Sequence, residues 1–332
     1  MPRYAVLGAT SWGLTLAHLL CRGGAEVTLL VRDRDEANRL QTERGIPRLP
    51  ELVLPDSVHV AVQAEWSGGD GLVAAVPAQS LRTALGGVAL PRDIPLLSAA
   101  KGIEHGTLLR MSEVAIELGW PSELVGVISG PNLAHEVARG LPAASVIAAA
   151  SEDTAAAWQS ALSTGAFRCY RSRDVVGTEL GGALKNIIAI AAGAAAGLDL
   201  GANAIAAIMT RGLAEMTRLG VALGADPATF LGLAGIGDLA ATCYSPLSRN
   251  HRLGELLARG ATPAEALAQI AETVEGAATT PVALQLGHRV GVELPIAEQV
   301  GAVLDGTSTV GQAMVSLLSR ALRSEVEPLS GW

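Results

Sequence analysis

Lysine is used at only two places in this chain. The sequence contains 24 lysine and arginine residues in total, and only Lys101 and Lys185 are lysines. A coding bias toward arginine explains most of this usage, but not why these two positions are spared. Arginine does not release its proton near neutral pH, whereas a partly buried lysine can. The usage therefore predicts that both lysines serve sites that need a compact or titratable ammonium group.

A helical pattern surrounds Lys185. Thr178, Gly181, Gly182 and Lys185 are spaced at i, i+3, i+4 and i+7, which places them on one face of a helix. Glycine costs about 1 kcal/mol inside a helix, so the pair indicates that another segment packs closely against this face. A lysine one turn further on would be partly desolvated, which favours donation of its proton to a developing alkoxide. The alternative is an ordinary lysine whose stem lies along a seam between helices.

A second group of polar residues lies in the segment 232–252. This segment is too rich in Gly, Ser and Pro for one uninterrupted helix. Asp238 could pair with a lysine and keep its ammonium charged and oriented. Arg249 and Asn250, at the expected start of a helix, could bind a phosphate dianion. An ordinary helix cap and a surface ion pair explain the same two residues equally well, so both interpretations stay open.

The N-terminal turn reads Gly8-Ala-Thr-Ser-Trp-Gly13. A complete dinucleotide-binding turn is G-x-G-x-x-G, in which the middle glycine lets the pyrophosphate approach the backbone. Here Thr10 takes that position, so the motif is incomplete. Its context is nevertheless right, because a strand precedes it and a helix N-terminus follows to hold phosphates. The turn predicts a dinucleotide site, and the alternative is a tight turn with a structural role only.

Two adjacent charges follow the second expected strand. An acidic residue there would hold the ribose 2′-hydroxyl of NAD, whereas arginine would accept the 2′-phosphate of NADP. The chain offers both, as Arg32 and Asp33, and Asp33 lies 20 residues after Gly13. A solvated charge cluster is the third interpretation, so the choice of NAD or NADP stays open.

These residues must be positioned by two kinds of architecture. The sequence predicts strands at Arg3–Gly8, Glu26–Val31, Val58–Val62, Leu72–Val76, Ile94–Leu97, Val125–Ser129 and Ala144–Ala149, with helices at 79–86, 107–118, 132–139 and 151–162 between the later ones. Such alternation is typical of an α/β fold with a Rossmann-type, doubly wound sheet. From about Val175 the strand signals stop, and helices are expected at 176–198, 202–224, 249–259, 263–271, 277–289, 296–304 and 310–321. We therefore expect a dinucleotide-binding domain over 1–174 and an all-helical catalytic domain over 175–332.

Helix starts are marked in two places. Thr262 followed by Pro263 fits an N-cap and a first helical residue, and Thr307 is the expected cap of the last helix.

Composition limits the class of protein. The 332 residues are 49% hydrophobic and 17% charged, which excludes a disordered chain. A net charge of −8 argues against nucleic acid or an anionic membrane as the main partner. Cys21, Cys169 and Cys243 are far apart, without metal-ligand spacing, which fits a reducing cytoplasm. We expect no targeting segment, and the most apolar stretch, Ile187–Leu200, is too short and too interrupted for a membrane span.

The longer motifs resemble a known family. SAAKGIE, GPNLAHEVARGLP, VVGTELGGALKNIIAIAAG, LGLAGIGDLAATCYSPLSRN and VEG are similar to segments of the NAD(P)-dependent glycerol-3-phosphate dehydrogenases of bacteria, and occur in the same order. The resemblance implies reduction of dihydroxyacetone phosphate to sn-glycerol 3-phosphate for phospholipid synthesis, with NAD or NADP as cofactor. It also implies a cytoplasmic homodimer.

The resemblance assigns roles to individual residues. Lys185 matches the catalytic lysine, Asp238 would orient it, and Lys101 would contact substrate and cofactor. Motif and resemblance together assign substrate contacts to Lys101, Gly130, Asn132, Lys185, Asn186, Asp238, Thr242, Ser248, Arg249 and Asn250. They assign cofactor contacts to Gly8, Thr10, Ser11, Trp12, Gly13, Arg32, Asp33, Lys101, Ala134, Arg249 and Glu275.

The chain departs from the usual pattern at four positions. Thr10 replaces a glycine, Asn132 stands where serine or threonine is common, His135 where lysine is common, and Asp33 where a second basic residue is frequent. Two other functions remain as alternatives: a 3-hydroxyacid or 6-phosphogluconate type dehydrogenase, which also joins a Rossmann domain to a helical one, and a non-catalytic nucleotide-binding sensor.

Overall fold

The computed structural model describes residues 1–87, 90–322 and 324. The chain forms two compact units, Met1–Glu179 and Leu180–Trp332, called here the N-terminal and C-terminal units. They divide within α7 (Val175–Gly197), a single helix that belongs to both. The domain boundary expected between residues 174 and 175 falls at the start of this helix.

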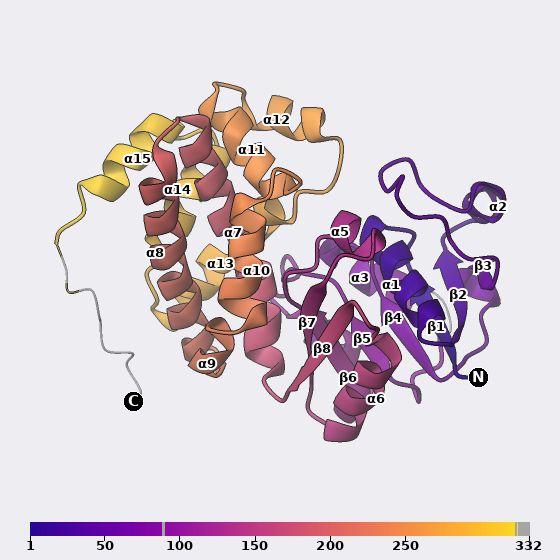
Figure 1. Cartoon of the computed structure of the whole chain (residues 1–332). Coiled ribbons are helices and arrows are strands. Elements are labelled where there is room, and N and C mark those ends of the chain that lie inside the picture. The colour runs from indigo at the N-terminus through magenta and orange to yellow at the C-terminus, as the bar shows by residue number, and fades with distance from the viewer. Residues whose placement is uncertain (88–89, 323, 325–332) are drawn as a thin grey trace. The chain divides into compact units, whose positions relative to one another are not determined.

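The N-terminal unit is built on one eight-stranded sheet (Figure 1). Its strands are β1 (Arg3–Leu7), β2 (Glu26–Val31), β3 (Val58–Val62), β4 (Gly71–Ala74), β5 (Leu96–Ser98), β6 (Val125–Ser129), β7 (Ala143–Ala149) and β8 (Phe167–Ser172). They lie in the order β3-β2-β1-β4-β5-β6-β7-β8, and every neighbouring pair is parallel except β6 with β7. The first six strands thus have the Rossmann order, and the predicted fold class is confirmed.

Apolar side chains on both faces of this sheet explain its continuous hydrophobic strands. Val6 belongs to one core cluster with Leu16 of α1 (Ser11–Arg22), while Leu7 belongs to another with Leu81 of α3 (Leu81–Gly86). Because successive side chains of a strand point to opposite faces, β1, β2, β4, β5 and β6 contribute to both clusters, whereas β7 and β8 contribute only to the first. The register aligns Leu7 with Leu30 and with Ala74, so the ends of β1, β2 and β4 meet at one edge.

Two elements of this unit were not expected from the sequence. β8 is an edge strand whose outward positions carry Arg168 and Arg171, so its apolar content is low. The charge cluster after β2 forms a helix, α2 (Arg34–Glu43). The expected helices occur as α3, α4 (Met111–Glu117), α5 (Ala134–Ala138) and α6 (Glu152–Leu162). α4 starts later than predicted because Leu108 adopts a left-handed conformation, with φ of 62°.

The C-terminal unit is helical throughout the residues that the structure describes (Figure 1). After α7 come α8 (Gly201–Ala222), α9 (Pro227–Phe230), η4 (Leu233–Gly237), α10 (Asp238–Tyr244), α11 (Arg249–Ala258), α12 (Pro263–Ile270), α13 (Glu275–Val290), α14 (Pro295–Leu304) and α15 (Val310–Leu318). The segment 232–252 is interrupted, as predicted: a π-helical turn, α10, a short loop and the start of α11 follow one another.

One predicted helix cap is confirmed and one is wrong. Thr262 caps α12 and accepts a hydrogen bond from the backbone of Glu265, with Pro263 as the first helical residue. The last helix is capped by Thr309 rather than by Thr307. Thr309 and Gln312 form a reciprocal capping box, a stronger start signal than a lone threonine.

The C-terminal unit is organised around α7. This helix has the length and composition of a membrane span, but 78% of its most apolar window is buried inside the protein. At Gly181, Gly193 and Gly197, other segments of the chain pack closely against α7. A Cβ atom added at Gly181 would lie 2.4 Å from the carbonyl oxygen of Ala234, and one at Gly193 would lie 1.9 Å from that of His251. The close packing that the paired glycines predicted is therefore present at Gly181, where η4 contacts α7.

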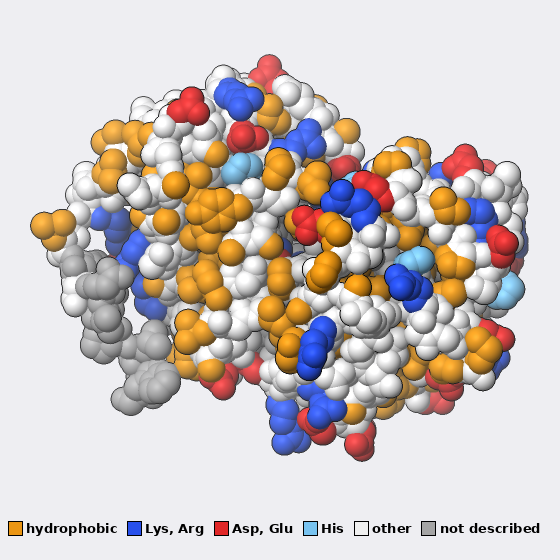
Figure 2. Space-filling model, viewed as in Figure 1, with side chains coloured by type: hydrophobic (Ala, Val, Ile, Leu, Met, Phe, Trp, Pro, Cys, Tyr) orange, Lys and Arg blue, Asp and Glu red, His pale blue; other side chains and the backbone are white. Residues whose placement is uncertain are grey.

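Some hydrophobic side chains of this unit reach the surface. Tyr244 and Leu247 are 56% and 49% exposed, on either side of the turn that joins α10 to α11. Figure 2 shows hydrophobic side chains scattered over the displayed face of the C-terminal unit. The loop between α10 and α11 is therefore open to solvent.

Candidate active site

The strongest concentration of buried polar groups is centred on Lys185. Its ammonium group donates hydrogen bonds to Oδ1 of Asp238 and to Oγ1 of Thr242, the latter at 2.7 Å. The hydroxyl of Thr242 in turn donates to the backbone oxygen of Asp238 at 2.7 Å. The Lys185 and Asp238 side chains are only 8% and 3% exposed. A buried ion pair held by a third group is a site with a fixed geometry rather than a surface salt bridge.

The helices fix this cluster from both sides. Lys185 projects from α7, one turn after Gly181, against which η4 packs directly. Asp238 is the first residue of α10, immediately after η4, and Thr242 follows one turn later on the same face. The small residue at 181 thus lets the start of α10 approach the lysine.

Cys243 adjoins the cluster but is chemically inert there. Burial raises the pKa of its thiol to about 12, so it stays protonated near neutral pH. Lys185 is therefore the group in this cluster suited to donate a proton.

Two asparagines connect the cluster to the neighbouring helices. Nδ2 of Asn250 donates to Oδ1 of Asn186 at 2.9 Å, and Oδ1 of Asn250 accepts from the backbone N–H of Gly276 at 2.9 Å. Both side chains are buried. The Asn250 amide thus joins α11 to α7 and α13. The sequence suggested a phosphate contact for this side chain, and the structure gives it a bracing role as well.

The start of α11 is polar and partly open. Ser248 caps this helix by accepting a hydrogen bond from the backbone of His251 at 3.2 Å. Arg249 is 42% exposed, and its nearest acid, Glu272, is 3.5 Å away. Glu275 is the first residue of α13. Arg249 therefore presents a solvated guanidinium beside a helix N-terminus, not a buried one.

In the N-terminal unit, Lys101 forms hydrogen bonds with two other residues that were predicted to contact the substrate. Its ammonium donates to the carbonyl oxygen of Gly130 at 3.1 Å and to Oδ1 of Asn132 at 3.0 Å. Nδ2 of Asn132 donates to Ser145 Oγ at 2.9 Å, which fixes the amide orientation. Ala134 follows as the first residue of α5. Lys101, Gly130 and Asn132 thus form one cluster, and their contact with the substrate stays a prediction.

The turn after β1 fits a dinucleotide pyrophosphate. Gly8 has φ of +109°, and a Cβ there would lie 2.8 Å from the Ala75 carbonyl oxygen. A Cβ at Gly13 would lie 2.1 Å from the Gly8 carbonyl oxygen. Both glycines are therefore required by the backbone itself. Ser11 and Trp12 form the first turn of α1, whose N–H groups have no partner within the helix and suit an anion.

Thr10 is the N-cap of α1. Its hydroxyl accepts from the backbone N–H of Gly13 at 2.9 Å and donates to the carbonyl oxygen of Ala75 at 2.8 Å. The hydroxyl proton is thus directed to the protein. The threonine that replaces glycine at position 10 therefore links the turn after β1 to α1 and to the residue that follows β4.

The two charges after β2 have different environments. Asp33 is the N-cap of α2, and its carboxylate accepts from the backbone of Glu36 at 2.9 Å. The Arg32 side chain is 89% exposed, with the Glu36 carboxylate 3.9 Å away. The carboxylate is thus engaged by its own helix, whereas the guanidinium extends into solvent.

One residue near the turn was missed. Arg48 donates a hydrogen bond to the carbonyl oxygen of Ala9 at 2.8 Å, which holds its guanidinium beside the N-terminus of α1. Arg48 lies in a loop 39 positions further along the chain, and no spacing rule connects the two segments. Only the folded structure shows this contact.

A Rossmann-type unit with a dinucleotide-binding turn, joined to a helical unit with a buried Lys–Asp pair, is an arrangement that suits a two-domain dehydrogenase. Family models for the N-terminus and the C-terminus of NAD-dependent glycerol-3-phosphate dehydrogenase match residues 3–155 and 174–315. The chain belongs to this family. The membership replaces the two alternative functions that the sequence left open.

The sequence is similar to those of glycerol-3-phosphate dehydrogenases over nearly its full length. The chain is 47% identical over 327 residues to glycerol-3-phosphate dehydrogenase (NAD(P)+) 2 of Mycobacterium bovis, covering 97% of this chain and 98% of that protein. It is also 47% identical to the Frankia casuarinae enzyme of this name, covering 96% and 97%. A crystal structure of the Coxiella burnetii glycerol-3-phosphate dehydrogenase superposes with a TM-score of 0.88 at 34% identity, covering 96% of this chain and 99% of that one.

Proposed function

We propose that this protein reduces dihydroxyacetone phosphate to sn-glycerol 3-phosphate, with NADH or NADPH as reductant. The observation that carries the proposal is the buried Lys185–Asp238–Thr242 cluster in a chain of this family. A nicotinamide cofactor, when bound, supplies the hydride that adds to the ketone carbon. The residues of the chain then have to bind the phosphate, orient the carbonyl and protonate its oxygen.

Lys185 is the proton donor in this proposal. As the ketone carbon is reduced, negative charge develops on its oxygen, and the proton moves from Nζ of Lys185 to that oxygen. Asp238 and Thr242 accept hydrogen bonds from the same ammonium and so fix its direction. Lys101 adds a second positive charge that stabilises the developing oxyanion. The Lys185–Asp238 pair is buried, so water does not screen its charges, and the electrostatic interactions of the ammonium group are stronger than at the surface.

The start of α11 would bind the phosphate group of the substrate. Arg249 and the backbone N–H groups at the start of this helix provide a cation and a helix N-terminus for a dianion. Asn250 and Asn186 hold this end of α11 against α7, which carries Lys185. The same contact therefore fixes the distance between phosphate site and proton donor.

The cofactor would be held by the N-terminal unit. Gly8, Gly13 and the first turn of α1 provide the pyrophosphate cradle, and Arg48 adds a cation beside it. Arg32 suits the 2′-phosphate of NADP, since its guanidinium is exposed, while Asp33 is engaged as a helix cap. We therefore expect the enzyme to use NADPH better than NADH.

We propose that the enzyme works in the cytoplasm, as a homodimer, and supplies glycerol 3-phosphate to glycerophospholipid synthesis.

The test is an absorbance assay at 340 nm with dihydroxyacetone phosphate and each reduced cofactor. Oxidation of NADPH or NADH that requires the phosphorylated ketone supports the proposal. Turnover of 3-hydroxyacids or 6-phosphogluconate, with none on dihydroxyacetone phosphate, would refute it, and so would cofactor binding without turnover.

A further inference from the structure

The C-terminal unit contains a large cavity apart from the Lys185 cluster. Its volume is about 980 Å³, within the range of small-molecule binding sites. Helices α7, α8, α14 and α15 form its walls. It is lined on α7 by Ile190, Ala191, Ala194 and Ala195, four residues that follow Lys185 along the same helix. Leu198, just after the end of α7, also lines it.

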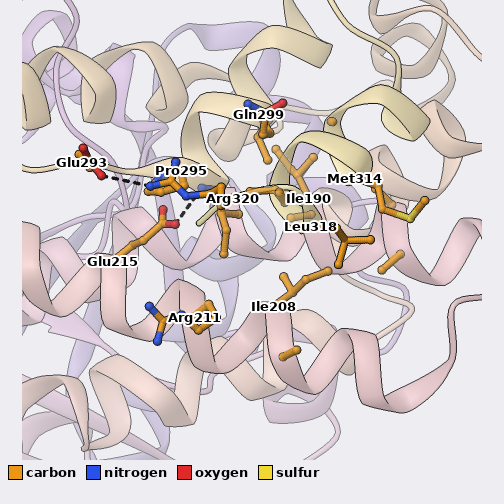
Figure 3. A pocket seen from close by; sticks show the side chains of 18 of the residues that line it. Ile190, Ile208, Arg211, Glu215, Glu293, Pro295, Gln299, Met314, Leu318 and Arg320 are labelled. Carbon is orange, nitrogen blue, oxygen red and sulfur yellow. Dashed lines mark hydrogen bonds and ion pairs between the residues drawn. The ribbon is translucent and has the colours of Figure 1, made fainter. Parts of the chain in front are cut away.

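The cavity has an apolar end and a charged end. Ile208, Met314 and Leu318 lie together at one end, as Figure 3 shows, and Arg211, Glu215 and Arg320 lie toward the other. Saturated side chains dominate the lining, which excludes a sugar or a nucleotide as a favourable occupant of the apolar end. The arrangement suits a molecule with a long alkyl chain and a polar head.

The charges at the polar end favour an anionic head. The lining there contributes three arginines, Arg211, Arg218 and Arg320, against the two acids Glu215 and Glu293. Arg320 is paired with Glu293 at 3.1 Å. Arg211 has no hydrogen bond or ion pair to any residue within 1–87, 90–322 or 324, and it is only half-buried.

Glu215 interacts electrostatically with Arg218 and makes no ion pair with Arg211 among the described residues. Its carboxylate accepts from the backbone N–H of Ile296 at 2.8 Å and, more weakly, from that of Ala297, at the start of α14. The acid is thus directed to the protein. Burial also raises its pKa to about 7, so that it is only partly ionised near neutral pH.

From the shape and the charge we infer that this cavity binds a single-chain amphiphilic anion, of the fatty-acid class, with its carboxylate at Arg211 and its alkyl chain between α7, α8 and α15. This inference stands independently of the reaction proposed above. The contacts are a charge-assisted hydrogen bond at the head and apolar burial along the chain.

The test is isothermal titration of the whole chain with octanoate, decanoate and dodecanoate, below their micelle-forming concentrations. Burial of each added methylene tightens binding about fourfold, so each two-carbon step should lower Kd by about fifteenfold. Decanol, with the same chain and no charge, should bind at least about tenfold more weakly than decanoate. Equal affinities for the whole series would overturn the inference, as would failure of every member to bind.

Variants locate the site. Arg211→Gln should weaken decanoate by about tenfold, whereas Arg259→Gln, at an exposed position outside the cavity, should not. Ala207→Trp fills the cavity from an exposed position on α8 and should abolish binding. Ala206→Trp, the neighbouring exposed residue outside the lining, is its control. Decanoate binding that survives both Arg211→Gln and Ala207→Trp would place the ligand elsewhere.

A second copy of the chain is the competing occupant, and sedimentation velocity separates it from a ligand. If another copy fills the cavity, Ala207→Trp should lower the sedimentation coefficient while Ala206→Trp leaves it unchanged. That result, with no titratable heat from decanoate, would overturn the inference. Unchanged sedimentation, with decanoate binding lost only in the filled variant, supports it.

Discussion

The ammonium group of Lys185 on α7 donates a hydrogen bond to the carboxylate of Asp238 at the start of α10, 53 residues further along the chain. Both side chains are buried, so each leaves the other with an uncompensated charge if it is removed. This ion pair joins the proton donor to the start of α10, directly after the turn that packs on Gly181.

Lys185→Arg should lower kcat by a factor of about 100 or more. Arginine keeps the positive charge beside Asp238 but has no proton to release near neutral pH. Steady-state kinetics with dihydroxyacetone phosphate measure the loss. The cofactor Kd from isothermal titration should stay within about twofold of the wild type, because the dinucleotide turn lies in the other unit. Near-normal turnover in this variant would remove Lys185 from the role of proton donor.

Arg249→Ala should raise KM for dihydroxyacetone phosphate about tenfold. The guanidinium is 42% exposed, so the phosphate contact it makes is partly solvated and smaller than that of a buried ion pair. Unphosphorylated dihydroxyacetone, a poorer substrate, should be almost unaffected. Arg252→Ala, at an exposed position on the same helix, is the control. Equal losses on both substrates would show that Arg249 serves the cofactor or the fold instead.

Thr10→Val should destabilise the protein by about 1 kcal/mol and weaken cofactor binding. The change keeps the bulk but removes the hydroxyl that caps α1 and bonds to Ala75. Thr10→Ser keeps both hydrogen bonds and should behave like the wild type. Chemical denaturation and cofactor titration measure the two effects. If the valine variant keeps its stability, the cap has no energetic role in this turn.

Arg32→Gln should raise KM for NADPH about tenfold and leave KM for NADH within about twofold. The lost contact is the one between an exposed guanidinium and the 2′-phosphate, which NADH lacks. Arg34→Gln, at the start of α2, removes a nearby arginine that pairs with Glu65 and is the matched control. A parallel rise for both cofactors would assign Arg32 to the pyrophosphate or to folding.

Glu215 makes stability depend on pH in a defined direction. Burial raises its pKa from 4.5 to about 7 in the folded protein, so the folded state binds a proton that the unfolded state releases. Its favourable contribution is therefore complete below pH 4.5 and is lost as the pH rises through about 7.

Replacement of Glu215 by Gln should remove this dependence. The unfolding free energy of the wild type, minus that of Glu215→Gln, should fall by roughly 3 kcal/mol between pH 4 and pH 8. Urea denaturation at several pH values gives this difference, and Asp305→Asn, at an exposed position after the end of α14, should show no such change. A difference that is flat with pH would mean that the Glu215 carboxyl titrates normally in the folded state.

The sequence by itself determined the fold class and the pair at the centre of the site. Short apolar runs mark the strands of this sheet, so β2, β3 and β6 were located to the residue. The rarity of lysine indicated Lys101 and Lys185, and the glycines of α7 indicated that another segment must touch it there. Apolar runs, residue usage and helical spacing are local properties of the sequence, so these features could be predicted without a structure.

The tertiary structure alone decided where polar side chains direct their hydrogen bonds. The hydroxyl of Thr10 faces Ala75, Asn250 bridges Asn186 and Gly276, and Arg48 reaches Ala9. Each of these contacts joins segments far apart in the chain. Each side chain involved could form hydrogen bonds equally well with many other polar groups. Which partner is chosen depends on the backbone that packing brings within about 3 Å, and no local pattern encodes that choice.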